Sequence, residues 1–151
     1  MGSFYPAVRL LSGNKMEKWD LVKIYGRAMR SEHYIEALSV GYQLIEFILE
    51  FVLTTQPVGK DNATISKSKV RKSKYLIQKA KLALENEFIT QDIFDEIDEF
   101  NKLRKDIIHN LVENNVDGAD IVKCANMVGD VYYSIQQTFL GGGEIGEWKE
   151  A

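Results

Sequence analysis

The feature that most constrains the fold is an apolar segment over residues 32–54. Its polar residues recur at spacings of three and four, which places them in one narrow stripe along a helix. They are Glu36, Ser39, Gln43, Glu46, Glu50 and Thr54. A surface helix has a single apolar stripe, whereas a helix that is apolar around most of its circumference is buried on several sides. We therefore expect either the central helix of a bundle or a helix that also gives one face to a partner subunit.

The same segment and the cysteine content predict where the protein works. Gln43, Glu46 and Glu50 interrupt the apolar run, so we do not expect it to span a membrane. The beginning of the chain lacks the basic and apolar regions of a signal peptide. The single cysteine, Cys124, excludes an intramolecular disulfide and fits a reducing compartment. With two histidines it forms no zinc-ligand pattern. We predict a cytoplasmic protein without a metal or cofactor.

Capping residues and apolar spacing predict four further helices. They cover about 15–29, about 70–86, a stretch that begins after the cap Thr90 and ends at Asn114 and Asn115, and a stretch from Asp117 to the glycines at 141–143. Residues 55–69 have the composition of a loop. No strand pattern is evident. A chain of 151 residues is long enough for one domain with a substantial core. We therefore predict an all-α, up-and-down bundle of about five helices over 14–140, with a lead-in over 1–13 and a flexible tail over 141–151.

Two blocks of opposite charge follow the central helix. Between Lys60 and Lys81 there are eight basic residues and one acid, and residues 85–99 are acidic. Such blocks are usually solvated faces, and the alternative is a patch that binds a polyanion. The candidate RNA-binding residues are Lys69, Arg71, Lys72, Lys74 and, from a later helix, Lys105. Only one aromatic residue, Tyr75, lies among the basic residues, so we expect no platform for stacking bases.

The candidate catalytic residues are Arg104, Asp106 and His109, late in the fourth helix. Arg104 falls in line with an apolar stripe, and a guanidinium cannot lose its charge, so burying it requires an anionic partner or a wet cleft. Asp106 is three residues from His109, on the same face, where it can orient the imidazole as a proton donor. Arg104 and His109 lie about 140° apart around a helix. They converge only if the arginine bends round, the helix frays, or a second copy faces the first.

Residues 17–140 resemble the HEPN superfamily, helical-bundle domains of prokaryotic toxin–antitoxin and defence systems. Two stretches carry the resemblance: Ser31 to Leu38, running into the long apolar helix, and Ile97 to His109. The family signature is an arginine, four to six residues and then a histidine, and here four residues separate Arg104 from His109. Arg27 and His33 have a matching spacing, but Ser31 is expected to break the helix between them.

The resemblance implies a homodimer in which two motifs meet and cleave RNA without a metal, the ribose 2′-hydroxyl attacking the adjacent phosphate. It implies that Arg104 binds the phosphate and that His109 transfers protons. It also implies a restraining antitoxin protein. The position after the family's arginine often carries Asn, Asp or His, whereas here it is Lys105. The alternative is therefore a non-catalytic helical dimer that binds protein or nucleic acid, with Arg104 paired with an acid and His109 on the surface.

Overall fold

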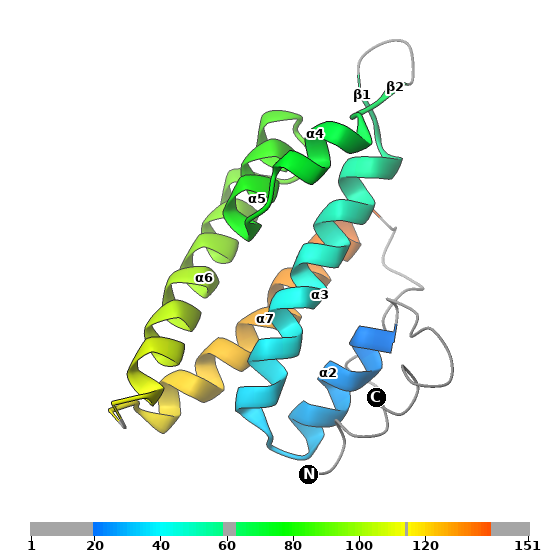
Figure 1. The fold of residues 1–151 in the computed structure, drawn as a ribbon. Helices are drawn as coiled ribbons and strands as arrows, with labels where there is room; N and C mark the ends of the chain where they lie inside the picture. Colours follow the sequence, from blue (N-terminus) through cyan, green and yellow to red (C-terminus); the bar gives the residue numbers. More distant parts are fainter. Residues whose placement is uncertain (1–19, 59–62, 114, 140–151) are drawn as a thin grey trace, which may run out of the picture.

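A computed structural model describes residues 20–58, 63–113 and 115–139 (Figure 1). The described chain is mostly helical, which confirms the all-α prediction. Its helices are α2 (Asp20–Arg30), α3 (Tyr34–Thr55), α4 (Lys67–Lys72), α5 (Leu76–Glu85), α6 (Gln91–Leu111) and α7 (Gly118–Phe139). The predicted lead-in over 1–13, the tail over 141–151 and the expected helix start near residue 15 lie outside the described residues.

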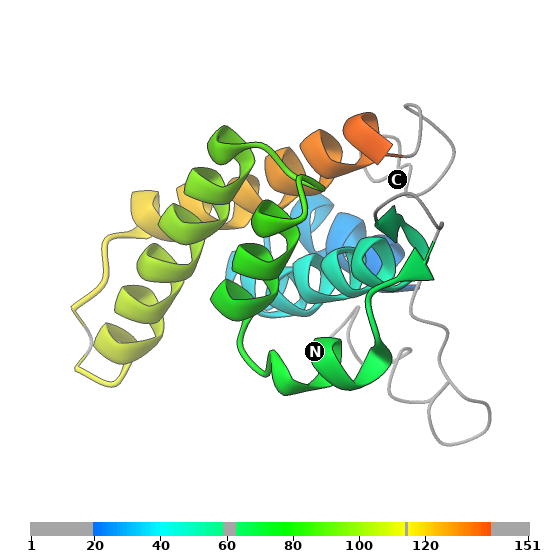
Figure 2. The ribbon, with the colours of Figure 1, turned by 90° about the horizontal axis from the view of Figure 1, so that it is seen from above.

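Helix α3 occupies the middle of the fold, as its apolar circumference predicts. It packs against α2, α5 and α7, and ten of its residues are buried. Figure 1 shows α7 running behind α3, and in Figure 2, seen from above, α2 and α4 lie on different sides of α3. Within the described part, α3 is also the one helix whose length and composition would suffice to cross a membrane, and 56% of that apolar window is buried inside the fold.

The polar stripe of α3 is used in part to bind α5. Lys79 of α5 is buried, and its Nζ lies 2.9 Å from Glu46 Oε2 and 3.4 Å from Glu50 Oε1. Burial by itself lowers the pKa of Lys79, but the two carboxylates outweigh it, so that the pKa is raised. A charged lysine is therefore tolerated in the interface because two acids of the stripe, Glu46 and Glu50, face it.

Helices α2 and α3 are both held closely against α7. The buried hydroxyl of Tyr25 donates to the carbonyl oxygen of Ala125 at 2.7 Å and accepts from the amide of Gly129 at 3.1 Å. It thus bridges two groups that lie four residues apart on α7. On α3, a Cβ atom at Gly41 would clash with the side chain of Val128, so the close approach of α3 and α7 requires glycine there.

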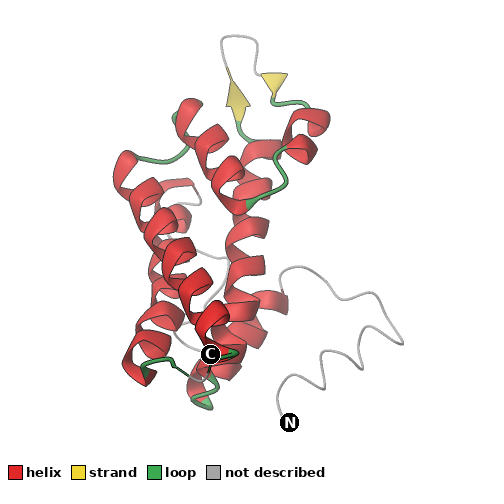
Figure 3. Cartoon of the chain, turned by 60° about the vertical axis from the view of Figure 1, so that its left-hand side comes forward, coloured by secondary structure: helices red, strands yellow, loops and turns green. Residues whose placement is uncertain are grey.

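The predictions for residues 55–86 were wrong in two respects. The expected loop contains a short antiparallel ladder, β1 (Pro57–Val58) with β2 (Ala63–Thr64), followed by α4 (Figure 3). The expected single helix over 70–86 is two helices, with a break at 73–75. Ser66 caps α4 by accepting a hydrogen bond from the amide of Lys69 at 3.2 Å, and Val70 is buried. One cap and one buried side chain stabilise a helix too short to show apolar periodicity.

Candidate functional site

Arg104 lies on the inner side of α6, where it reaches α3. Helix α6 begins at a cap in which Thr90 Oγ1 accepts from the amide of Ile93 at 3.2 Å, and it is unbroken to Leu111. The side chain of Arg104 is half-buried, and its Cζ atom lies 4.1 Å from the centroid of the Tyr42 ring on α3. This is the geometry of a cation–π contact. The arginine that interrupts the apolar stripe is therefore held against an aromatic face.

The guanidinium of Arg104 has unused hydrogen-bonding capacity. Among the residues that the structure describes, it forms no ion pair or hydrogen bond, and its Nε is buried without a hydrogen-bond partner. A buried donor without an acceptor costs about 1–3 kcal/mol. The acidic side chain that the sequence predicts as a partner for a buried Arg104 is therefore not found within the described part of the chain.

Cys124 of α7 lies near Arg104 but has no reactive character. It is fully buried, and its Sγ is 4.0 Å from the carbonyl oxygen of Phe100. Burial raises the pKa of Cys124 to about 11, although the positive charge of Arg104 acts in the opposite direction. Because the thiolate is the nucleophile, this thiol is poorly suited to attack a substrate.

Lys105, Asp106 and His109 are exposed on the outer side of α6. No hydrogen bond or ion pair joins Asp106 to His109 where the structure describes them. Since the helix is continuous from Arg104 to His109, fraying does not bring these two side chains together. The stacking of Arg104 on Tyr42 also directs its guanidinium towards α3. Of the three routes to convergence, the first two are therefore not seen in the described structure.

The apolar face of α6 continues beyond the part that the other helices cover. Its earlier members, Ile93, Ile97, Phe100 and Ile107, are buried. By contrast, Ile108, Leu111 and Val112 are 38%, 40% and 89% exposed. These three residues, which we call the α6 end patch, lie on either side of His109 in the sequence. They leave apolar surface exposed at this end of α6.

The second Arg–His pair in the chain is divided by a helix break. Helix α2 ends at Arg30, α3 begins at Tyr34, and Glu32 between them has a φ of 60°, in the left-handed region. His33 lies beside Glu36 on α3, with Nδ1 3.7 Å from Oε2. The break confirms the reason for setting aside Arg27 and His33.

Further charged side chains occupy two other places. The candidate RNA-binding residues Lys69, Arg71, Lys72 and Lys74 are exposed on and just after α4, near the C-terminal end of α3. An acidic cleft between α6 and α7 is lined by Glu96, Glu99 and Asp130 together with Lys123. Within the described ranges, no three His, Cys, Asp or Glu side chains are arranged to hold a metal ion.

Comparisons with protein-family models, with curated proteins and with solved structures found no match to this chain. The resemblance to the HEPN superfamily therefore depends on the sequence motif. Sequence reasoning placed Arg104, Asp106 and His109 but missed the stacking of Arg104 on Tyr42. Arg104 stood out in the sequence, yet nothing in the spacing of either helix indicates that it would meet Tyr42.

Proposed function

We propose that this protein is a metal-independent endoribonuclease of the HEPN kind, with an active site completed by a second copy of the chain. One observation carries the proposal: Arg104 is held against Tyr42 while its buried Nε lacks a hydrogen-bond partner among the described residues. An RNA phosphate would supply both the missing acceptor and the missing negative charge. Packing by itself does not explain an arginine with an unpartnered Nε at this position, because an aliphatic side chain would fill the same space without burying a polar group.

The second copy is needed because of the geometry of α6. Arg104 faces α3 and His109 is exposed about 140° away on the same unbroken helix. A two-fold axis near the α6 end patch would cover Ile108, Leu111 and Val112 and bring the two copies of His109 together. Each site would then combine Arg104 of one protomer with His109 of the other. We propose that the helices form an up-and-down bundle that dimerises in this way.

The proposed reaction transfers the phosphodiester within the RNA. The 2′-hydroxyl loses its proton and its oxygen bonds to phosphorus, while the bond from phosphorus to the 5′ oxygen breaks. The 5′ oxygen receives a proton, so that the products carry a 2′,3′-cyclic phosphate and a 5′-hydroxyl. Arg104 stabilises the charge on the phosphoryl oxygens, and His109 transfers a proton. Lys105 is exposed one residue from Arg104, where it can neutralise a neighbouring phosphate. Asp106 is proposed to orient His109 once RNA is bound.

The resemblance also suggests the setting of the reaction. A toxin or defence nuclease that acts on cellular RNA requires restraint, so we propose an antitoxin protein as a partner. A cytoplasmic location follows from the same proposal, because the substrate is found there.

The competing function is a non-catalytic helical dimer that binds protein or nucleic acid. It is favoured by Lys105 in place of the family's usual polar residue and by the lack of a contact between Asp106 and His109 in the described structure. Under this alternative, Arg104 and the basic residues would bind a ligand without cleaving it.

A cleavage assay in excess chelator separates the two functions. Structured RNA is incubated with the wild-type protein, Arg104→Met and His109→Ala, and the product ends are identified. We expect cyclic-phosphate ends from the wild type and a loss of about 100-fold or more with either variant. Equal cleavage by wild type and His109→Ala, or none by either, would remove the nuclease proposal. His33→Ala is the matched control and should cleave normally.

Mixing the two inactive variants tests the composite site. A dimer containing one Arg104→Met chain and one His109→Ala chain would hold one intact site, so re-equilibrated mixtures should recover about a quarter of the wild-type rate. No recovery, in a mixture shown to exchange subunits, would place both residues of the site in a single chain.

A further inference from the structure

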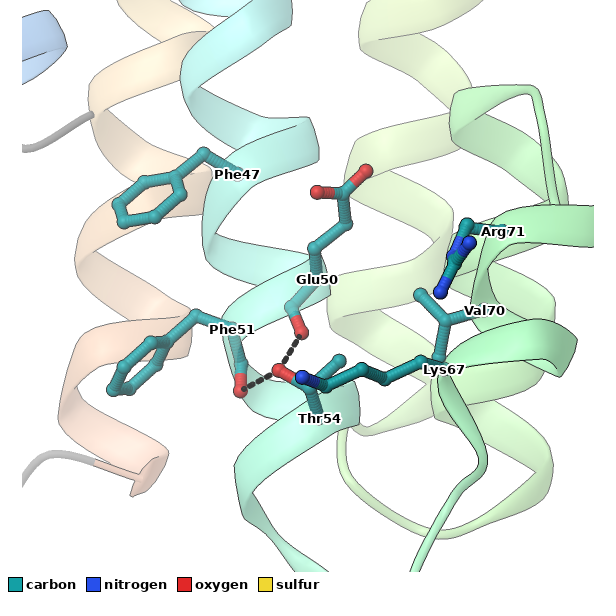
Figure 4. Close-up of a pocket in the computed structure, with 7 residues that line it drawn as sticks. All are labelled: Phe47, Glu50, Phe51, Thr54, Lys67, Val70 and Arg71. Carbon is teal, nitrogen blue, oxygen red and sulfur yellow. Dashed lines mark hydrogen bonds between the residues drawn. The ribbon is translucent and has the colours of Figure 1, made fainter. Parts of the chain in front are cut away.

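A cleft of about 300 Å³ lies between α3 and α4, away from Arg104 (Figure 4). Phe47 and Phe51 of α3 line one part of it, and Lys67 and Arg71 of α4 line another. Figure 4 shows the two rings on one side of α3, the two cationic side chains on the other side, and Glu50 between them. The cleft therefore presents an aromatic surface and a cationic surface to a single occupant.

The cationic side of the cleft calls for an anion. Lys67 and Arg71 are one turn apart on α4 and exposed, and their side chains form no hydrogen bond or ion pair with any other described residue. From Ala63 to Leu84 the chain has seven Lys and Arg residues and no Asp or Glu. Glu50 is the acid in the cleft, and Lys79, which it shares with Glu46, lies 3.4 Å from its carboxylate and offsets part of its charge. The local field thus favours a polyanion over a single small ion.

Two aromatic rings form one side of the cleft. The centroids of Phe47 and Phe51 are 6.4 Å apart, with the rings tilted by 50°. The buried side chain of Val70 lies on the opposite side of the cleft, with Lys67 and Arg71. From the sequence we expected no stacking platform, because only Tyr75 lies among the basic residues. The fold adds two aromatic rings from α3 to the lining of the cleft, across Glu50 from the basic side chains of α4. Bases that stack on aromatic side chains and phosphates that pair with cations are the pattern of single-strand binding.

We propose that the α3–α4 cleft binds single-stranded RNA, with a base against Phe47 or Phe51 and phosphates on Arg71 and Lys67. Glu50 can accept a hydrogen bond from an exocyclic amino group of that base. The inference deepens the proposed function and rests on it, because the bound strand is the substrate. Phe51 to Thr54 lie about 14–18 Å along α3 from Tyr42 by helical rise, so the cleft would hold RNA some nucleotides from the cleaved bond.

The test uses a fluorescent single-stranded oligonucleotide with 2′-O-methyl riboses, which the 2′-hydroxyl reaction cannot cleave. Affinity is measured by anisotropy over a series of salt concentrations. Arg71→Ala should lower the slope of log affinity against log salt by about 0.7, because one phosphate contact is lost. Phe47→Leu combined with Phe51→Leu should weaken binding by about fivefold or more at every salt concentration and leave the slope unchanged.

Two matched controls lie outside the cleft. Lys81→Ala removes an exposed cation of α5, and Tyr75→Leu removes an exposed aromatic beside the basic helix. Both should bind as the wild type does. The proposal is overturned if these controls weaken binding as much as the cleft variants do, or if Arg71→Ala and the double leucine variant bind normally. It is likewise overturned if the oligonucleotide does not bind, which would leave the cleft for an acidic protein partner. Because Arg71 is exposed, its variant tests the cleft without disturbing the packing of α3.

Failure of this inference is distinguishable from failure of the proposed function. If the protein binds the oligonucleotide through the cleft but never cleaves RNA, the proposed nuclease function is wrong and the proposed binding site is retained. If Arg71→Ala and the double leucine variant cleave RNA with the same kcat/KM as the wild type, the proposed binding site is wrong and the proposed nuclease function is retained.

Discussion

Replacing Arg104 with methionine tests whether its guanidinium stabilises the fold or is positioned to bind a ligand. Methionine keeps an unbranched stem in the apolar stripe of α6 and removes the guanidinium. The site is informative because the two contributions to stability can be read from the structure. The guanidinium stacks on Tyr42, which is favourable, and its buried Nε lacks a partner among the described residues, which is unfavourable.

The expected change in unfolding free energy is small. Removing the unpartnered donor should stabilise the protein by about 1–3 kcal/mol. Losing the cation–π contact should destabilise it by about 0.5–2 kcal/mol. The net change therefore lies between a loss of about 1 and a gain of about 2.5 kcal/mol. An arginine in a buried ion pair would behave differently, because removing it costs about 3–5 kcal/mol.

Thermal and urea unfolding can resolve these outcomes. For a chain of this size, 1 kcal/mol corresponds to a change of about 2–4 °C in Tm. We expect Arg104→Met to unfold between about 4 °C below and 10 °C above the wild type, and to lose RNA cleavage. The matched control, Lys105→Met on the exposed side of the same helix, should change stability by less than about 0.5 kcal/mol. A loss of about 3 kcal/mol or more in Arg104→Met, which is the cost of breaking a buried ion pair, would show that our account of Arg104 is wrong.

Three further predictions concern other residues. Tyr25→Phe should lower the unfolding free energy by about 1–3 kcal/mol, because Ala125 and Gly129 both lose the hydroxyl; an unchanged urea midpoint would contradict this. Glu96→Gln should stabilise the protein at pH 7, because burial, then Asp130, Asp92 and Glu99, raise the pKa of Glu96. A raised carboxyl pKa means that the charge opposes folding above the ordinary pKa, so the gain should disappear as the pH falls towards 4, and a gain that persists in acid would refute the reasoning. Cys124 should react with iodoacetamide only on unfolding, because it is buried and its pKa is raised to about 11; rapid labelling of the native protein would contradict its burial.

Several features of this protein could be read from its sequence. The apolar circumference of residues 32–54 predicted a helix buried on several sides, and α3 packs against α2, α5 and α7. The cap at Thr90 predicted the start of α6. Arg104 was recognised as a charge within an apolar stripe. Each of these inferences uses residues within one or two turns of each other, where helical periodicity and capping set the geometry.

Other features were decided only by the tertiary structure. The break at 73–75 and the helix α4 depend on one cap and on the burial of Val70 against the rest of the fold, and neither leaves a periodic signal. The Tyr42 ring under Arg104, and the cleft that Phe47 and Phe51 line together with Arg71, join segments that are far apart in the chain. Local periodicity states which face of a helix is apolar, but it does not state which residue of another helix that face will meet. That pairing is set by how the helices pack, and here it determines both the surroundings of Arg104 and the cleft proposed to bind RNA.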